Sequence, residues 1–299
     1  MKKTKKYIPC TKPKIHTSEY IKDDIIKHLM EKKPFSLVRI GDGDLKFLKF
    51  CISKIENKID LKNIDNKNLH WKAAQQGVTF DKIDFIWNIY RDVSNRANYI
   101  SSFQLYTNRK KSANAKQLLK NWIDVYNKMN IINDKYCDPD ISFYLFNDMR
   151  LLKTIKDNDF KLCLVTSFEE QNFINLKEYG IKFKVLQIPQ ANKVRNKVGK
   201  RSFINNVPVE KWHINEYDRV KSELIEECKN SDIFFVAGGM IGRSYTNIVK
   251  QNGKVAVDLG KMVNYWITGR IPGRFNKGDV ISKNKLIIKA NNRFGEIYG

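Results

Sequence analysis

The chain has 299 residues, with 55 Lys and Arg against 32 Asp and Glu, and its formal net charge is +23 at pH 7. Hydrophobic residues make up 42% of the chain, which is enough for a buried core and excludes a disordered protein. The positive charge indicates anionic partners such as nucleotides, phosphorylated substrates, nucleic acid or an anionic lipid surface. The chain is also rich in Lys, Asn and Ile together, so part of this charge fits a general bias of composition.

The start of the chain, MKKTKKYIPC, is basic but lacks the apolar stretch of a signal peptide. No apolar run approaches the roughly 18 residues that a membrane span needs. Five scattered cysteines without a CxxC pair and four dispersed histidines support neither a disulfide framework nor a zinc site. We therefore expect a soluble, cytoplasmic protein whose basic surface also suits peripheral contact with an anionic membrane.

The first half of the chain mixes helix and strand patterns. Residues 1–17 have the composition of a basic, poorly ordered N-terminal arm. After this arm, apolar residues at helical spacing and short apolar runs indicate the elements. Helices are predicted at 18–31, 44–52, 66–92 and 111–129, and strands at 35–40 and 98–103.

The second half alternates more regularly between strand and helix. Strands are predicted at 160–168, 183–189, 232–239 and 254–260, and helices at 169–180, 215–230, 242–253 and 261–269. Such alternation with short connections predicts an α/β fold, a Rossmann-like parallel sheet with helices on both faces. We expect one catalytic domain over residues 18–299. Residues 190–214 read as a basic insertion because Lys or Arg stands at 193, 195, 197, 200 and 201.

The stretch FSLVRIGDGDLKFL places two carboxylates on a glycine turn at the end of a predicted strand. Gly41 and Gly43 allow a tight bend, and Asp42 and Asp44 on that bend can converge on one point. Carboxylate oxygens there would suit Mg²⁺ or Mn²⁺, which also bridge phosphates. The alternative is an Asx-turn in which Asp44 caps the following helix. The motif alone leaves both interpretations open.

A second glycine turn lies in VAGGMIGRSYTNIVKQNG, between a predicted strand and a predicted helix. Free backbone N–H groups and the helix dipole make such a turn a suitable anion site, and Arg243 can add a forked contact to a diphosphate. Gly238, Gly239 and Gly242 match neither GxGxxG nor a Walker loop. A plain tight turn between strand and helix is the alternative interpretation.

Asp258 ends a third apolar strand, in VAVDLGKMVNYW, just before another glycine. A helix cap is the simpler interpretation of Asp258, and Tyr265 and Trp266 fit a core better than a ligand platform. Ligands of parallel sheets bind at the carboxyl ends of the strands, where all three turns fall. An acidic turn and a glycine turn on one sheet edge together suit a nucleoside diphosphate.

These segments resemble the GT-D fold glycosyltransferases. FSLVRIGDGDLKFL is similar to the opening strand and DxE motif of that family, in which arginine-phenylalanine-glycine-aspartate-glycine-glutamate is usual. DIFFVAGGMIGRSYTNIVKQNGKVAVDLGKMVNYW resembles its strand, Gly-Pro-Thr loop, helix and Ile-Asp-Ile-Gly-His strand end. KVLQIPQAN resembles the segment between them, and the order agrees from about residue 18 to 270.

The resemblance implies transfer of a hexose-type sugar from a nucleotide sugar, usually a UDP-sugar, to a glycan or glycoconjugate, with Mn²⁺ or Mg²⁺. It implies that Asp42 and Asp44 hold the metal and act in catalysis. The residues expected to bind the donor are Arg39, Gly41, Gly43, Gly238, Gly239, Arg243, Asp258 and Lys261.

Two residues depart from the family pattern. Asp44 stands in place of glutamate, which shortens the reach of the carboxylate by one methylene. Lys261 stands in place of histidine, and a protonated lysine cannot bind a metal, although it can offer a positive charge to phosphates. Metal dependence is therefore expected to be weakened or altered. The basic insertion is a candidate contact for an anionic or lipid-linked acceptor.

An inverting transfer needs a base within reach of the acceptor hydroxyl, and Glu169 is the candidate, with Glu170 beside it. Helix capping is the alternative role of these two glutamates. Two other functions remain open from the residues. A nucleic-acid-binding protein would suit the charge, but no recognised module is visible. A metal-dependent phosphoesterase or nuclease would suit the acidic turn, but no further ligands are patterned around it.

Overall fold

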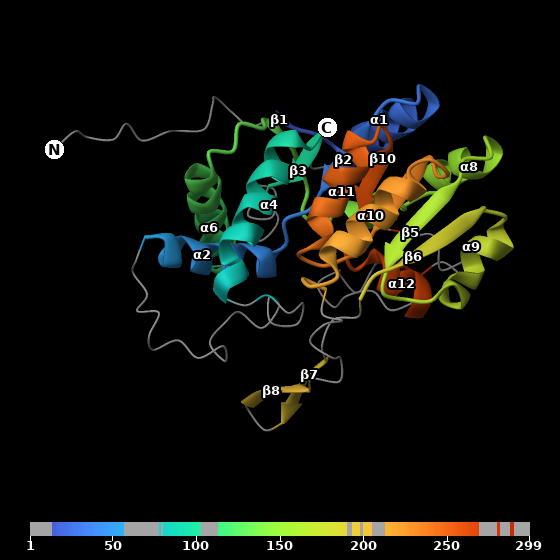
Figure 1. The fold of residues 1–299 in the computed structure, drawn as a ribbon. Helices are drawn as coiled ribbons and strands as arrows, with labels where there is room; N and C mark the ends of the chain where they lie inside the picture. Colours follow the sequence, from blue (N-terminus) through green and yellow to red (C-terminus); the bar gives the residue numbers. More distant parts are fainter. Residues whose placement is uncertain are drawn as a thin grey trace.

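A sheet of eight parallel strands forms the centre of the fold (Figure 1). The computed structural model describes residues 14–56, 78, 80–102, 113–189, 193–197, 200–204, 213–268, 280–281 and 288–289. In their order across the sheet the strands are β1 (Lys14–Ile15), β4 (Lys135–Cys137), β3 (Tyr99–Ser101), β2 (Phe35–Val38), β10 (Val255–Asp258), β9 (Ile233–Val236), β5 (Leu162–Thr166) and β6 (Phe183–Gln187). The predicted parallel α/β fold is confirmed.

Two short pairs of strands lie outside this sheet. They are β7 (Lys193–Lys197) with β8 (Lys200–Ile204), and β11 (Val280–Ile281) with β12 (Ile288–Lys289). Both pairs are antiparallel. The β7–β8 ribbon falls within the predicted basic insertion and stands away from the sheet at the bottom of Figure 1.

The central strands are buried along their whole length and mostly apolar, because each face of the sheet is covered. Side chains of a strand alternate between the two faces. In β9, Ile233 and Phe235 pack into one core, whereas Phe234 and Val236 pack into the other. A continuous apolar run is therefore the expected sequence of such a strand, and it made the strands of the second half easy to predict.

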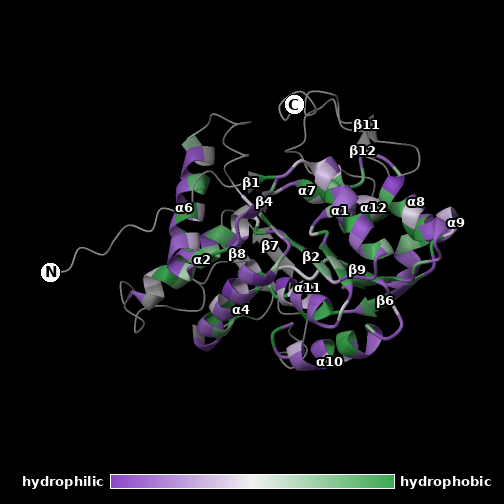
Figure 2. Cartoon of the chain, turned by 90° about the horizontal axis from the view of Figure 1, so that it is seen from above, coloured by the Kyte–Doolittle hydropathy of each residue, from purple (hydrophilic) through white to green (hydrophobic). Residues whose placement is uncertain are grey.

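Helices cover both faces. One face carries α2 (Asp42–Ile55), α4 (Ile83–Arg96), α6 (Ala113–Met129), α10 (Tyr217–Glu227) and α11 (Gly242–Gln251). The other carries α1 (Ser18–Met30), α7 (Ile141–Tyr144), α8 (Arg150–Asp157), α9 (Ile174–Tyr179) and α12 (Met262–Thr268). The 3-10 turns η3 (Phe80–Lys82) and η4 (Glu170–Phe173) precede α4 and α9. In Figure 2 the helices mix green and purple residues, as expected of helices with one apolar side.

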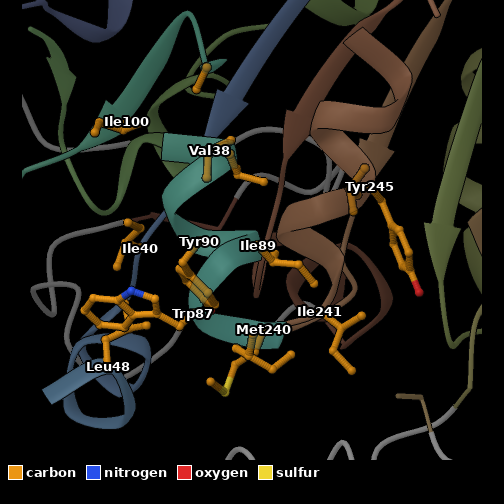
Figure 3. Packing of buried hydrophobic residues seen from close by; sticks show 14 of the residues in the cluster. Val38, Ile40, Leu48, Trp87, Ile89, Tyr90, Ile100, Met240, Ile241 and Tyr245 are labelled. Carbon is orange, nitrogen blue, oxygen red and sulfur yellow. The ribbon is translucent and has the colours of Figure 1, made fainter. Parts of the chain in front are cut away.

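The core on the first face joins segments that are far apart in the chain. Figure 3 shows Leu48 of α2, Trp87 and Tyr90 of α4, and Tyr245 of α11 among its residues. All four side chains are buried. This core fixes α2, α4 and α11 against the central strands β2 and β10, which is where the candidate site lies.

Most predicted elements exist, with corrected limits. The helix predicted at 44–52 begins two residues earlier, at Asp42. Gly41, rather than Asp44, is the residue before its first turn. The helix predicted at 169–180 divides into η4 and α9, although it ends as expected at Gly180, which has a left-handed φ of 89°. The part of 66–92 before residue 78 lies outside the described residues.

The predicted N-terminal arm is too long, since β1 lies inside it and the side chain of Thr17 caps α1. Residues 1–13 lie outside the described part. Several short elements were not predicted, among them β4, α7 and α8, because three to eight residues carry too little periodicity to recognise. The cysteines at 51, 137, 163 and 228 are free and buried. No helix in the described residues has the length and hydropathy of a membrane span.

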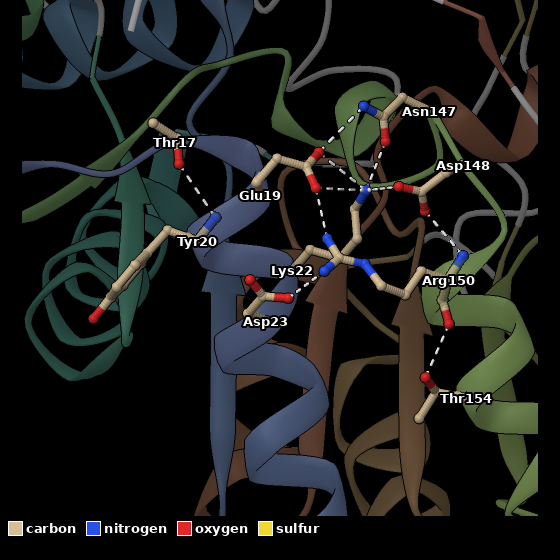
Figure 4. A network of polar contacts seen from close by, with 9 residues as sticks. All are labelled: Thr17, Glu19, Tyr20, Lys22, Asp23, Asn147, Asp148, Arg150 and Thr154. Atoms are coloured by element: carbon tan, nitrogen blue, oxygen red, sulfur yellow. Dashed lines mark hydrogen bonds and ion pairs between the residues drawn. The ribbon is translucent and has the colours of Figure 1, made fainter. Parts of the chain in front are cut away.

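A buried lysine ties α1 to the segment before α8 (Figure 4). Lys22 is fully buried, and its Nζ donates to Asn147 Oδ1 at 2.6 Å and to Asp148 Oδ2 at 2.8 Å. Glu19 accepts a further bond from the same Nζ, and Arg150 bridges back to Glu19. The carboxylates balance a charge that would be costly to bury alone. This network is separate from the site described below.

A buried histidine, His213, contacts the hydroxyl of Tyr245 on α11. His213 is 3% exposed, and its Nε2 lies 2.8 Å from the Tyr245 hydroxyl. Burial, with a smaller contribution from Arg219, lowers the pKa of His213 from 6.5 to about 3. The folded protein therefore keeps this ring neutral at pH values where the unfolded chain protonates it.

This difference predicts a loss of stability in acid. Because the pKa is lower in the folded state, the contribution of His213 is complete above pH 6.5 and is lost as the pH falls towards about 3. At pH 5 the loss is about 2 kcal/mol, from 1.36 kcal/mol per pH unit. Urea unfolding at pH 7 and pH 5 should show this difference in the wild type and a smaller one in His213→Gln. Equal pH dependence in both proteins would contradict the assignment.

Candidate functional site

Three strand-to-helix turns meet at the carboxyl edge of the sheet centre. β10 lies between β2 and β9, so the turns that follow these three strands are neighbours. The turns contain residues 39–41, 237–241 and 259–261. Ligands of parallel sheets bind outside this edge. The structure therefore brings together the three turns that the sequence singled out.

Asp44 lies in the first turn of α2, and its carboxylate faces inward. It is 5% exposed. Its Oδ2 accepts the Gly41 backbone N–H at 2.6 Å, as the third residue of a helix does in a capping box. Its Oδ1 accepts the Tyr90 hydroxyl at 2.9 Å, and Arg243 Nη2 lies 3.2 Å from Oδ2. Asp44 therefore caps α2, as the turn interpretation expected, and also carries a buried ion pair.

Arg243, the second residue of α11, sits between two carboxylates. Its Nη1 lies 2.9 Å from Asp258 Oδ2, and its Nη2 pairs with Asp44. Arg243 is 6% exposed. Burial lowers the pKa of the guanidinium, but the charges of Asp258 and Asp44 outweigh it and raise the pKa above its usual value. Arg243 is thus permanently charged and joins the first turns of two helices.

Asp258, at the end of β10, is fully buried. Its Oδ2 also accepts the Arg39 backbone N–H at 3.1 Å, and its Oδ1 accepts the Gly260 N–H at 3.0 Å. Burial raises the pKa of Asp258, and the charges of Arg243 and Arg39 act in the opposite direction. Asp258 therefore holds the ends of β2 and β10 together, beyond the helix cap that its position suggested.

The Arg39 side chain binds the protein backbone on either side of β2. Its Nε donates to the Pro139 carbonyl at 2.8 Å, and its Nη1 lies 3.4 Å from the Leu259 carbonyl oxygen. The first contact reaches the turn after β4, and the second reaches the turn after β10. Arg39, predicted to bind the donor, thus has a clear role in fixing three turns. Two positive and two negative side chains balance one another at the site: Arg39, Arg243, Asp44 and Asp258.

The glycine turn between β9 and α11 is closely packed. A Cβ on Gly238 would lie 2.7 Å from Gly242 Cα, which is closer than real Cβ atoms approach, and a tight 3.2 Å from Ile188 Cδ1. Gly239 has a φ of 62° and is exposed. Glycine at 238 therefore lets α11 begin this close to β9, and glycine at 239 adopts the left-handed backbone without strain.

Three other predicted residues lie around this centre. Asp42 begins α2, and its side chain lies outside the described part of the structure. Lys261 is exposed in the turn after β10. Glu169 is exposed after β5, two strands away from β10, and its Oε2 accepts the Gln171 side chain at 2.6 Å. Their roles in binding and catalysis stay predictions.

Two residues of the site were not predicted. Tyr90 reaches Asp44 from the middle of α4, and burial together with the Asp44 charge raises the Tyr90 pKa, so its hydroxyl stays protonated as a donor. Ser101, at the end of β3, accepts the Ile40 N–H at 2.7 Å and donates to the Ile40 carbonyl at 2.9 Å. Neither residue stands in a motif. Only the order of the strands brings them here.

The described residues offer a poor site for a divalent metal ion. Among them, no group of three His, Cys, Asp or Glu side chains is placed to hold one. The two oxygens of Asp44 already accept three donors, one of which is a guanidinium. Asp44 therefore does not fit the predicted role of metal ligand in this arrangement. Metal binding by Asp42 stays a prediction.

Comparison with known proteins agrees with this fold. The family of GT-D fold-like domains matches residues 16–266. Because the match covers most of the chain, the protein belongs to this family, and the predicted resemblance is confirmed. No curated protein matches the chain.

Solved structures are similar over almost the whole chain. "A New Glycosyltransferase (DUF1792) from Streptococcus sanguinis" has 12% identity and a TM-score of 0.50, covering 96% of this chain and 97% of that one. A selenomethionine-substituted structure of domain of unknown function 1792 has 14% identity and a TM-score of 0.49, covering 85% of this chain and 79% of that one. A structure of the same domain, described as a distinct glycosyltransferase fold, has 16% identity and a TM-score of 0.45, with 83% and 78% covered. The first of these likenesses shows a shared fold.

The contact between Arg39 and the turn after β10 predicts the effect of two glycine substitutions. Gly260 has a φ of 50°, and a Cβ there would lie 2.0 Å from Arg39 Nη1. Gly253 also has a positive φ, 80°, but its Cβ would meet nothing within 4 Å. Both alanine variants bear the cost of a left-handed residue, about 1–2 kcal/mol. Gly260→Ala should lose a further 1–3 kcal/mol or so by overpacking.

Urea unfolding of both variants measures this difference, with Gly253→Ala as the matched control. Equal losses of stability would mean that Arg39 moves away at little cost and does not lock the turn.

Proposed function

We propose that the protein is a glycosyltransferase that moves a hexose-type sugar from a nucleotide sugar, with UDP as the nucleotide, to a hydroxyl of a glycan or glycoconjugate. The observation that carries the proposal is the 3.2 Å contact between Arg243 and Asp44, which brings together the first turns of α11 and α2. Two helix N-termini then point their positive ends at one place on the sheet edge. Membership of the GT-D fold-like family supports the same reaction class.

The diphosphate of the donor would bind at the first turn of α2. By helix geometry, the N–H groups of Asp42, Gly43 and Asp44 have no acceptor inside the helix. Within the central cluster, the charges of Arg39 and Arg243 balance those of Asp44 and Asp258. Nε of Arg243 is buried and has no hydrogen-bond acceptor among the described residues, and a phosphate oxygen would supply one. Lys261 adds an exposed positive charge beside this place.

The transfer itself breaks the bond between the anomeric carbon and the β-phosphate oxygen and forms one to the acceptor oxygen. The acceptor hydroxyl then loses its proton to a base. Glu169 is the residue we assign to this step, because it is exposed at the same edge of the sheet and its carboxylate is not part of the central ion pairs. The helix N-termini stabilise the charge that develops on the leaving diphosphate.

The β7–β8 ribbon is the proposed contact for the acceptor. It follows β6 and lies beyond the sheet on the side where α12 begins after β10 (Figure 1). Its two strands contain five Lys and Arg residues, at 193, 195, 197, 200 and 201. Such a segment suits an acceptor that carries phosphate groups.

The donor site is tested by thermal unfolding with UDP, UDP-sugars and other nucleotides. Binding to the folded state stabilises it by about 2.7 kcal/mol at a ligand concentration 100 times Kd. UDP should raise Tm in the wild type and much less in Lys261→Ala. Lys254→Ala is the matched control, because Lys254 precedes β10 at the opposite edge and pairs with Asp232. No shift with any nucleotide would contradict the proposal and favour a nucleic-acid-binding protein.

The acceptor proposal is tested by titrating short polyphosphate into the wild type and a variant with Lys193, Arg195 and Lys197 changed to Ala. We expect weaker polyphosphate binding in the variant and an unchanged response to UDP. A parallel titration with single-stranded RNA separates the nucleic-acid alternative, since base-dependent binding much tighter than polyphosphate binding would support RNA as the partner. Equal polyphosphate binding by both proteins would contradict a role of the ribbon.

A further inference from the structure

We propose that Arg243 takes the place of a divalent cation in this site. In this arrangement Arg243 links the carboxylates of Asp44 and Asp258 to the diphosphate of the donor, and the donor binds without a metal ion. The inference rests on the proposed function, because it concerns the same donor. The inference goes beyond that function because it names Arg243 as the positive charge that the carboxylates of Asp44 and Asp258 hold at the donor site.

The contacts of Asp44 support the first part. Its two oxygens accept the Gly41 N–H, the Tyr90 hydroxyl and Arg243 Nη2, at 2.6, 2.9 and 3.2 Å. Asp44 is buried, with 5% of its surface exposed. A metal ion bound to Oδ2 would lie next to the guanidinium, and the two positive charges would repel each other at short range.

The setting of Arg243 supports the second part. Two carboxylates hold it, Asp44 through Nη2 and Asp258 through Nη1. Nε has no hydrogen-bond acceptor in the described part of the chain, although it is buried. An unsatisfied buried donor of this kind is uncommon in folded proteins. It indicates an oxygen acceptor that arrives with a ligand, and a phosphate oxygen is a suitable acceptor for a guanidinium.

Lys261 agrees with this assignment. It is exposed in the turn after β10, and a lysine ammonium is a cation rather than a metal ligand. The exposed Lys261 and the buried Arg243 would then supply two positive charges from the protein itself. Within the described residues, no set of three metal-binding side chains stands in their place.

The first test is isothermal titration of metal-free wild-type protein with UDP, in EDTA and in MnCl₂. We expect the two Kd values to agree within about twofold, less than 0.5 kcal/mol. A Kd that is about tenfold or more weaker in EDTA would overturn this inference and leave the proposed function standing. Absence of UDP binding in both buffers would overturn the proposed function and, with it, the inference.

The second test uses Arg243→Gln, with Arg243→Lys as the charge-retaining control. Removing the guanidinium leaves the Asp44 and Asp258 carboxylates facing each other, which is a site that can attract Mn²⁺. We expect Mn²⁺ to raise the Tm of Arg243→Gln clearly, and to change the Tm of wild type and Arg243→Lys little. A purely structural arginine would not produce this gain of metal response. Strong stabilisation of the wild type by Mn²⁺, or no gain in Arg243→Gln, would count against the proposal.

Arg243→Gln is the variant at risk of misfolding, so Asp44→Asn provides a separate check. The amide keeps the size of the side chain and an oxygen for the Gly41 N–H. If Asp44 is a positioning residue, this variant should unfold at a lower Tm yet bind UDP equally well in EDTA and MnCl₂. Binding of Mn²⁺ by the wild type that disappears in Asp44→Asn would identify Asp44 as a metal ligand and overturn the inference.

Discussion

The ion pairs of Arg243 with Asp44 and Asp258 are the contacts on which the site depends. They join the first turn of α11 to the first turn of α2 and to the end of β10. Removing one partner of a buried pair leaves the other charge uncompensated, at a cost of about 3–5 kcal/mol. Because both carboxylates and the guanidinium are almost fully buried, this cost applies to each member. These three side chains therefore hold the starts of α2 and α11 and the end of β10 together.

The same contacts explain why a basic protein places acidic residues at the end of a strand. Asp44 and Asp258 neutralise Arg243 and Arg39, and they also accept the backbone N–H groups of Gly41, Arg39 and Gly260. The remaining N–H groups at the start of α2 are free to meet an anion that comes from outside. In this account the acidic turn prepares an anion site by orienting an arginine and a helix. The glycine at 238 allows α11 to approach closely enough for that contact.

The sequence was sufficient for the features that local patterns encode. Apolar runs identified the central strands, and the glycine and aspartate turns at 41–44, 238–242 and 258–260 fell on one edge as expected. Local patterns could not decide the role of Asp44, because the same GDGD turn is compatible with a helix cap and with a metal ligand. Its partner Arg243 is 199 residues away, and Tyr90 comes from a helix that no spacing links to the turn. Short elements such as β4 and α8 were missed because their few residues carry little periodicity. Long-range partners of charged residues are thus decided by strand order, which one sequence shows only indirectly.

The most direct measurement is a crystal structure of the protein with UDP, grown in MnCl₂, with anomalous scattering recorded at the manganese edge. We expect that Arg243 remains between Asp44 and Asp258, that its Nε donates to a phosphate oxygen, and that no anomalous peak lies within bonding distance of Asp44. A manganese ion bound to Asp44 and to the diphosphate, with Arg243 displaced, would contradict it.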